Sequence, residues 1–243
     1  MIIIPDIHGR DFWKEAVKGN EKEEIIFLGD YVDPYSYFED VQPFDGLRSL
    51  REVIAFKKNH PDNVTLLLGN HDLSYVTPHA FKCRHDFENH DEISRLIQDN
   101  MQLFEIAYEK RVGNRNYIFS HAGILDGWLE NNEMILGHLS QSQKVKTLND
   151  LFQTGKLYLA LGDVSACRGG GSEYGSCVWA DLDEHIHGEV QSEVNNTQPA
   201  TGTFQVFGHT LQMSGRPYIT DHFACLDCRH AFRLNDDGTF TII

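Results

Sequence analysis

Short apolar runs that end abruptly in acidic, amide or imidazole side chains most constrain the fold of this chain. Four of them lie in the first half, at residues 2–4, 25–28, 64–68 and 117–119. Runs of this length without polar alternation are typical of strands buried on both faces of a sheet. Helical patterns separate the runs, so the alternation predicts an α/β fold.

Three helices are expected between these strands. Asp11 and Asp45 each precede an apolar pattern of helical spacing, and we expect both to cap their helices. A third helix is expected over a stretch with five apolar residues at helical spacing: Ile93, Leu96, Ile97, Phe104 and Ala107.

The second half of the chain changes character. One more helix is expected at 145–152, followed by a glycine-rich loop at about 163–178. Strand-like runs follow at 204–207, 218–220, 231–234 and 239–243, and the sequence Asp236-Asp-Gly favours a hairpin before the last. We expect one domain over 1–243, with a helical insertion around 75–112.

Composition narrows the classes of function. A net charge of −15 argues against binding to a nucleic-acid backbone, which needs a basic surface. No apolar run approaches the roughly 20 residues of a membrane helix, and the amino terminus lacks the pattern of a signal peptide. Five cysteines are too few for a disulfide framework. These features predict a cytoplasmic protein with reduced thiols and no membrane partner.

Polar residues collect where the strands end. The carboxyl ends of strands in open α/β sheets meet at one edge, so five separate segments are expected to share a site. Oxygen and imidazole ligands together suit manganese, iron or zinc better than calcium or magnesium alone. Gly29, Gly69 and Gly208 are expected where a strand turns sharply. The five segments contain Asp6 and His8, Asp30 and Asp33, Asn70 to Asp72, His121, and His209.

These segments, in this order, resemble the motifs of the calcineurin-like metallophosphoesterase family. The match is closest to the branch of protein serine/threonine phosphatases and diadenosine tetraphosphatases, and it spans positions 6 to 210. The resemblance implies a four-layer αββα sandwich with mixed β-sheets and two divalent metal ions. It implies that one metal is bound by Asp6 and His8, the other by Asn70, His121 and His209, and that both share Asp30.

The resemblance also implies a reaction. A metal-bridging hydroxide would attack phosphorus in line, because a metal pair lowers the pKa of bound water toward about 7. His71 would protonate the leaving oxygen, and Asp33 would hold its imidazole. No nucleophilic serine or cysteine is then required. We expect manganese as the most suitable metal, with iron or zinc as alternatives.

One departure from the family pattern bears on the substrate. The family's phosphatases usually continue the second motif with an arginine that grips phosphate, whereas here Pro34 and Tyr35 follow Asp33. Candidate replacements are Arg10 and Arg168, with Arg84 as a third. The missing arginine favours a phosphorylated small molecule or nucleotide as substrate over a phosphoprotein. A protein serine/threonine phosphatase and a non-catalytic, metal-stabilised binding scaffold remain the alternatives.

Two further patterns are ambiguous. The aromatic residues Tyr31, Tyr35, Tyr37 and Phe38 could stack on a substrate base, but packing in the core is the preferred interpretation. His185 and His187 lie two residues apart in an acidic stretch, where a solvated segment is a better interpretation than an accessory metal site.

Overall fold

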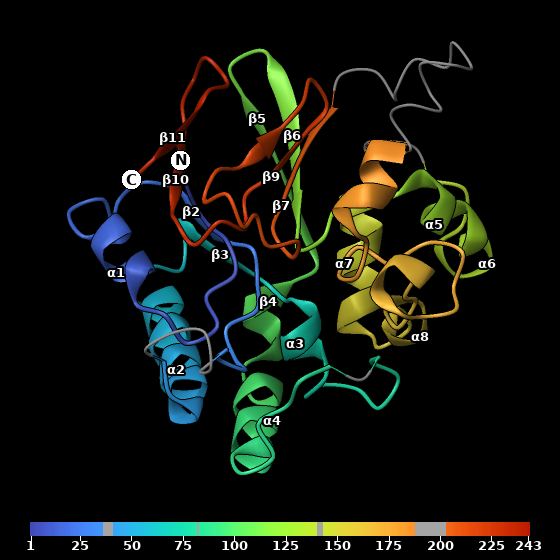
Figure 1. Ribbon diagram of the computed structural model, residues 1–243, viewed down its shortest axis with the longest axis horizontal. Helices are drawn as coiled ribbons and strands as arrows, with labels where there is room; N and C mark the ends of the chain where they lie inside the picture. Colours follow the sequence, from blue (N-terminus) through green and yellow to red (C-terminus); the bar gives the residue numbers. More distant parts are fainter. Residues whose placement is uncertain (36–40, 82, 140–142, 188–202) are drawn as a thin grey trace.

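Two mixed β-sheets packed face to face form the centre of the computed structural model (Figure 1). It describes residues 1–35, 41–81, 83–139, 143–187 and 203–243. One sheet has the order β11-β10-β1-β2-β3-β4 and the other β5-β6-β7-β9-β8. Their strands are β1 (Ile2–Ile4), β2 (Ile25–Phe27), β3 (Val64–Leu67), β4 (Phe104–Glu105), β5 (Ala107–Val112), β6 (Arg115–Ser120), β7 (Thr203–Phe207), β8 (Tyr218–Ile219), β9 (Phe223–Cys225), β10 (Phe232–Leu234) and β11 (Phe240–Ile242).

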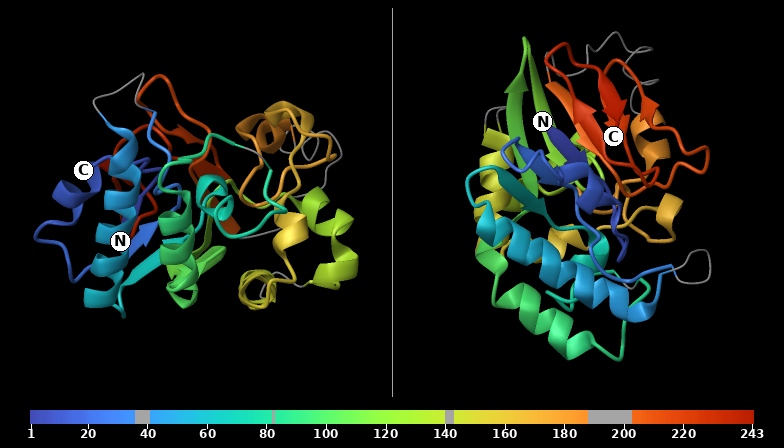
Figure 2. Two further views of the ribbon diagram at one scale, coloured as in Figure 1. Left: turned by 90° about the horizontal axis from the view of Figure 1, so that it is seen from below. Right: turned by 90° about the vertical axis from the view of Figure 1, so that its left-hand side faces the viewer.

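Helices lie outside and beside these sheets (Figure 2). The α-helices are α1 (Phe12–Val17), α2 (Pro43–Asn59), α3 (Asn70–Leu73), α4 (His90–Gln98), α5 (Asp126–Asn131), α6 (Glu133–Leu136), α7 (Lys144–Gln153) and α8 (Tyr158–Leu161). Short 3₁₀ turns are η1 (Met101–Leu103) and η3 (Ala166–Arg168). None of the helices in the described part of the chain is long and apolar enough to cross a membrane.

Strand β2 shows why these apolar runs need two packing partners. Ile25 and Phe27 pack in a core with residues of α1, α2 and α4, whereas Ile26 belongs to the core between the two sheets. All three side chains are fully buried. On the outer face of the second sheet, Leu182 packs against Phe207 in a third cluster. The predicted α/β fold with two mixed sheets is confirmed.

Parallel pairing brings the carboxyl ends of the central strands to one edge. In the first sheet β1, β2 and β3 are parallel neighbours. In the second sheet β6, β7 and β9 are likewise parallel. The two sheets face each other, so the loops after these strands converge although they are far apart in sequence.

The third expected helix is wrong beyond residue 98. Helix α4 ends at Gln98, and the chain continues through η1 into β4 and β5. The side-chain oxygen of Asn149 accepts hydrogen bonds from the backbone N–H groups of Ile106 and Ala107, at 2.9 and 3.2 Å. This pairing with α7, together with the β5–β6 ladder, outweighs the helical spacing of the apolar residues. The insertion expected at 75–112 is therefore helical only in part.

Asp45 also differs from its expected place. It lies inside the first turn of α2 rather than at the cap, which is Gln42. The Asp45 carboxylate accepts a hydrogen bond of 2.7 Å from the backbone N–H of Gln42. The sequence pattern correctly identified Asp45 as a residue that stabilises the helix start. The helix begins about one turn earlier than the pattern predicted.

The core between the sheets can be tested at Phe119, which is fully buried there. We expect Phe119→Ala to lower the free energy of unfolding by about 3–5 kcal/mol, because it leaves a cavity the size of a ring. Phe44 is 62% exposed, and Phe44→Ala is expected to stay within about 0.5 kcal/mol of the parent. Urea unfolding measures both; equal losses would contradict the assigned packing.

Candidate metal centre

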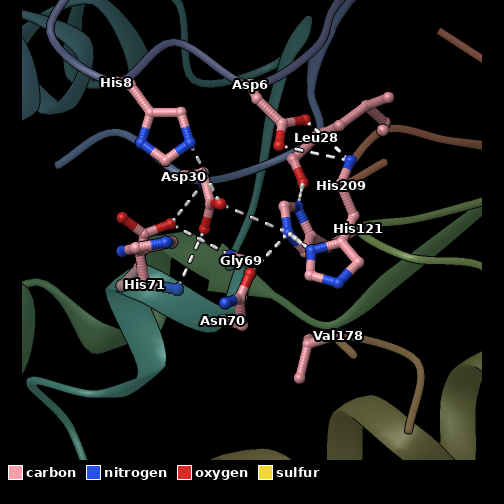
Figure 3. Close-up of polar contacts among 12 residues, drawn as sticks. Asp6, His8, Leu28, Asp30, Gly69, Asn70, His71, His121, Val178 and His209 are labelled. Atoms are coloured by element: carbon pink, nitrogen blue, oxygen red, sulfur yellow. Dashed lines mark hydrogen bonds and ion pairs between the residues drawn. The ribbon is translucent and has the colours of Figure 1, made fainter. Parts of the chain in front are cut away.

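The polar residues that end five strands converge in one buried cluster (Figure 3). Asp6 and His8 follow β1, Asp30 follows β2, and Asn70 opens α3 after β3. The second sheet contributes two histidines, one after β6 and one after β7, which are His121 and His209. All of these side chains are buried except that of His209, which is half-buried. The structure thus brings the six predicted metal ligands to one place.

Two histidines are fixed so that their lone pairs face the same carboxylate. Nδ1 of His8 lies 2.8 Å from the carbonyl oxygen of Val32, and Nδ1 of His121 lies 2.9 Å from that of Leu28. A carbonyl only accepts, so each Nδ1 carries the hydrogen and each neutral ring presents a lone pair at Nε2. These Nε2 atoms lie 3.4 and 3.5 Å from Oδ2 of Asp30. Acceptors opposed in this way fit a bound cation.

A second group of candidate ligand atoms surrounds His121. Its Nε2 lies 3.0 Å from Oδ1 of Asn70 and 3.2 Å from Nδ1 of His209. Nε2 of His209 is buried and has no hydrogen-bond partner among the described residues. Ligand atoms of Asp30, His121 and His209 lie within 4.8 Å of one another, as do those of Asp30, His8 and His71. Asp30 belongs to both groups, so it could be shared by two metals.

Electrostatics favour the neutral, ligand form of two of the histidines, whereas the carboxylate of Asp6 is destabilised unless a cation balances it. Burial lowers the pKa of His8 to about 3 and that of His209 well below its ordinary value, so both are neutral at pH 7. Burial, reinforced by the charge of Asp30, raises the pKa of Asp6. Carboxylates crowded in a dry site repel one another, and divalent cations would relieve that repulsion.

The backbone is strained at these positions. Five non-glycine residues in the described part of the chain have positive φ, and four of them are His8, Asp30, Asp33 and His209, at 46°, 53°, 56° and 63°. The left-handed region costs a non-glycine residue about 1–2 kcal/mol. The fifth, Arg229, lines the adjacent cavity. Packing around the site therefore holds these side chains in otherwise unfavourable orientations.

The three motif glycines serve two different needs. Gly29 has a φ of +110°, which fits the expected sharp turn. Gly69 and Gly208 lack a positive φ, so the turn explanation is wrong for them. A Cβ on Gly69 would lie 2.1 Å from Oδ1 of Asp30, and one on Gly208 would lie 2.1 Å from Oδ1 of Asp6. These two glycines allow the carboxylates to approach the backbone closely.

Asp72 connects two of the motifs, a role that the sequence did not reveal. Its buried carboxylate accepts backbone hydrogen bonds from Asp30 at 2.7 Å, Tyr31 at 3.0 Å and Gly69 at 3.0 Å. Its place beside His71 in the third motif was the only sequence signal. Asp72 fixes the loop after β2 against the start of α3, and thereby positions Asp30.

His71 and Asp33 form the pair that the sequence predicted, and Tyr75 extends it. Nδ1 of His71 lies 2.8 Å from Oδ2 of Asp33. The hydroxyl of Tyr75 donates a hydrogen bond of 2.6 Å to Oδ1 of the same carboxylate. Burial opposes protonation of His71, but Asp30 and Asp33 outweigh it and raise the pKa of His71 well above its ordinary value. The imidazole is therefore a suitable proton donor at neutral pH.

A cavity of about 660 Å³ opens onto this cluster, and arginines line it. Arg168 is held by Asp181, with Nε 2.5 Å from Oδ2, and it donates a 2.6 Å hydrogen bond to Thr210. Arg10 donates a 3.2 Å hydrogen bond to the carbonyl of Ile7. The cavity is also lined by Arg84, Arg229 and the buried Asp227. Both predicted phosphate-binding arginines thus reach the site.

Of the ambiguous residues, Tyr31 and His185 pack in the core, whereas Tyr35 lines the cavity. Tyr31 is fully buried and donates a 2.7 Å hydrogen bond to the carbonyl of Leu67. Tyr37 and Phe38 lie outside the described residues. His185 is buried against Phe207, with Nε2 3.0 Å from the carbonyl oxygen of Ala122. The expectation of a fully solvated segment is therefore wrong for His185, because its ring packs in the core. All five cysteines are free.

Comparison with known proteins assigns the chain to a family. A sequence model of the calcineurin-like phosphoesterases matches residues 1–212, so the chain belongs to that family. The catalytic subunit of serine/threonine-protein phosphatase 4 from Candida glabrata is 35% identical over 154 residues, which cover 61% of this chain and 41% of that protein. The same subunit from Eremothecium gossypii is 37% identical over 79 residues, covering 31% and 23%.

The alignments therefore span less than half the length of these curated relatives. Among solved structures, a cold-active protein-tyrosine phosphatase of a psychrophilic Shewanella species superposes with a TM-score of 0.53 at 13% identity. That match covers 99% of this chain and 79% of the other. Identity this low supports the shared fold and nothing more specific.

Metal binding should stabilise the folded protein. We expect manganese at about 100 times its Kd to raise Tm by roughly 5–10 °C, because the metal binds only the native arrangement. Asp30→Asn should remove most of this shift, since both ligand groups contain Asp30. Asp183→Asn, at an exposed acidic residue, should retain it. An undiminished shift in Asp30→Asn would place the metal elsewhere.

Proposed function

We propose that this protein is a metal-dependent hydrolase of phosphate esters or anhydrides. The observation that carries the proposal is the placement of Asp30 between the lone pairs of His8 and His121. Membership of the calcineurin-like phosphoesterases supports it. In this proposal Asp6 and His8 bind one metal, Asp30 is shared, and the second metal is bound by Asn70, His121 and His209. Manganese is the proposed ion, and iron or zinc would suit the same ligands.

The chain's own groups supply the proton for the leaving oxygen. The bound metals would activate water and offset charge on the phosphoryl group. His71 faces the same cavity, with Nδ1 engaged by Asp33, so Nε2 is left to donate to the leaving oxygen. Asp33 fixes the ring and favours its charged form, and Tyr75 fixes Asp33. Burial raises the pKa of Cys177 and Cys225, which argues against either thiol as a nucleophile.

For the substrate, we propose a phosphorylated small molecule or a nucleotide. A cavity of about 660 Å³ suits such a ligand. The absence of an arginine directly after Asp33 also separates this chain from the family's protein phosphatases. A phosphoprotein is the second candidate, favoured by the similarity to phosphatase 4 catalytic subunits. Hydrolysis rates for mononucleotides, dinucleoside polyphosphates and phosphopeptides at equal manganese would separate the two.

The proton donor can be tested by substitution. We expect His71→Ala to retain its metals and to lose about 10²- to 10⁴-fold in kcat, as removal of a general acid does. Metal content and hydrolysis of an aryl phosphate measure the two effects. Cys83 lies close to His71 and Asp33, so Cys83→Ala is the matched variant and should keep most activity. If Cys83→Ala loses activity while His71→Ala remains active, a covalent cysteine mechanism would explain the hydrolysis instead.

A separate substitution tests how Asp33 is positioned. Tyr75→Phe removes the hydroxyl that donates to Asp33 but keeps the buried ring. We expect kcat to fall about 10-fold for alkyl phosphates, because a hydrogen bond to a charged group is lost. Nitrophenyl phosphate should be affected less, since its leaving group needs little proton donation. Equal losses on both substrates would mean general damage to the site; Tyr218→Phe, at an exposed tyrosine, serves as control.

A further inference from the structure

Arg84 and Tyr35 form a stacked pair on the wall of the cavity. The guanidinium carbon of Arg84 lies 3.3 Å from the centre of the Tyr35 ring, and both residues line the cavity. The Tyr35 ring in turn lies edge-on to His8, with ring centres 5.0 Å apart, and its centre is 6.4 Å from that of His71. With one face covered by Arg84, the Tyr35 ring is less suited to stack on a substrate base.

The hydrogen-bonding groups of Arg84 are incompletely used. Its Nε and Nη2 atoms are buried and have no hydrogen-bond partner among the described residues. Within the same described ranges no carboxylate forms an ion pair with Arg84, whereas Arg168 is held by Asp181. A guanidinium stacked on a ring keeps its N–H groups in its own plane, where a planar or tetrahedral oxyanion can accept two of them. Arg84 therefore has the donor geometry to bind an oxyanion.

The position of this pair relates it to the leaving group. Arg84 follows Cys83, whose sulfur lies within 4.8 Å of ligand atoms of Asp33 and His71. By contrast, Arg168 donates to the carbonyl oxygen of His209, and Trp179 packs against the His209 ring. Through Tyr35 and its neighbour Cys83, Arg84 is linked to the part of the cavity that holds His8 and His71, whereas Arg168 lies near a ligand of the second proposed metal.

We propose that Arg84, supported by Tyr35, is a specificity-determining subsite for an oxyanion carried by the leaving group. The inference rests on the proposed function, in which His71 protonates the leaving oxygen and the leaving group therefore lies on this wall. The preferred substrates are phosphate monoesters whose leaving group also bears a carboxylate or a second phosphate. Phosphate esters without that second charge are hydrolysed, but less efficiently.

The step itself is ordinary hydrolysis. The oxygen of water forms a new bond to phosphorus and releases one proton to solvent, as the bond from phosphorus to the ester oxygen breaks. The ester oxygen takes the bonding electron pair and a proton from His71, which regains one from solvent. Arg84 exchanges no proton, because its guanidinium stays charged throughout. It holds the second anionic group and so orients the ester oxygen toward His71.

Matched aryl phosphates test this subsite. Phenyl phosphate lacks the second charge, 3-carboxyphenyl phosphate adds a carboxylate, and 1,3-phenylene bisphosphate adds a phosphate. We expect Arg84→Met to lower kcat/KM for one or both charged substrates by about 10- to 100-fold, as expected for a lost charged hydrogen bond. Phenyl phosphate should change by less than about 3-fold. Comparing the two charged substrates identifies which oxyanion is preferred.

Variants around the pair separate its parts. Tyr35→Leu should reproduce the selective loss, because the stacking face is gone, whereas Tyr35→Phe should retain selectivity. Arg84→Lys should give an intermediate loss, since it keeps the charge without the planar fork. Arg95 is an exposed arginine on α4, and Arg95→Met should match the parent on all three substrates. An equal loss on all three substrates in Arg84→Met would place Arg84 on the transferred phosphoryl group and overturn the proposal. No loss on any substrate would also overturn it.

A binding measurement distinguishes failure of the subsite from failure of the proposed function. Benzylphosphonate and 3-carboxybenzylphosphonate imitate the aryl esters but cannot be hydrolysed. Calorimetric titration of the manganese-loaded protein should show tighter binding of the carboxylated compound, and Arg84→Met should remove that preference. If the preference exists in a protein that hydrolyses nothing, the subsite stands and the proposed function fails. If the protein hydrolyses phosphate esters but binds both phosphonates equally, the proposed function stands and the subsite fails.

Discussion

The buried carboxylate of Asp30, placed between two imidazole lone pairs, is the interaction on which the rest of the site depends. The orientation of both rings follows from backbone carbonyls of Val32 and Leu28, which fix where the ring hydrogens lie. Without a cation, this arrangement sets acceptor against acceptor in a dry environment, which is costly. The left-handed backbone at His8 and Asp30 adds to that cost. Bound metal ions would stabilise this site, because they would lie between acceptor atoms that otherwise face one another.

The packing of the two sheets offsets the free-energy cost of these opposed acceptors and of the strained backbone. Neither sheet holds the site alone, since Asp30 follows a strand of one sheet and His121 a strand of the other. The core between the sheets therefore sets the distance between them. Asp72 adds local rigidity, because its carboxylate joins the loop after β2 to the start of α3. The stability of the fold and the geometry of the site therefore depend on the same core. Substitutions that loosen this core would move the ligand residues apart.

The departure from the family motif brings Tyr35 into the wall of the cavity. Pro34 stands where the family pattern has an arginine, and the next residue, Tyr35, supplies an aromatic ring on which Arg84 stacks. A guanidinium is thus present on this wall of the cavity, but it comes from a different segment of the chain. Around His71 the groups act in series, with Tyr75 holding Asp33 and Asp33 holding the imidazole. If His71 donates the proton as proposed, the leaving group would lie beside Arg84 and Tyr35.

The sequence by itself determined the α/β class, the segments that supply the site and most strands, because these depend on local patterns, but it missed β4, β5 and β9. Apolar runs such as residues 2–4 are typical of central strands, and motif residues follow them directly. The largest failure, the helix expected beyond residue 98, is caused by a long-range contact. The chain around Ile106 leaves the helix because Asn149 binds its backbone, and no local spacing encodes that partner.

Only the tertiary structure decided how distant residues meet. Gly69 is required by the approach of Asp30, Asp33 is held by Tyr75, and Arg84 stacks on Tyr35 from a segment 49 positions away along the chain. Periodicity and motif spacing describe what each segment prefers by itself. Which side chains come within hydrogen-bonding distance is set by the packing of the two sheets, and that packing is a property of the whole folded chain.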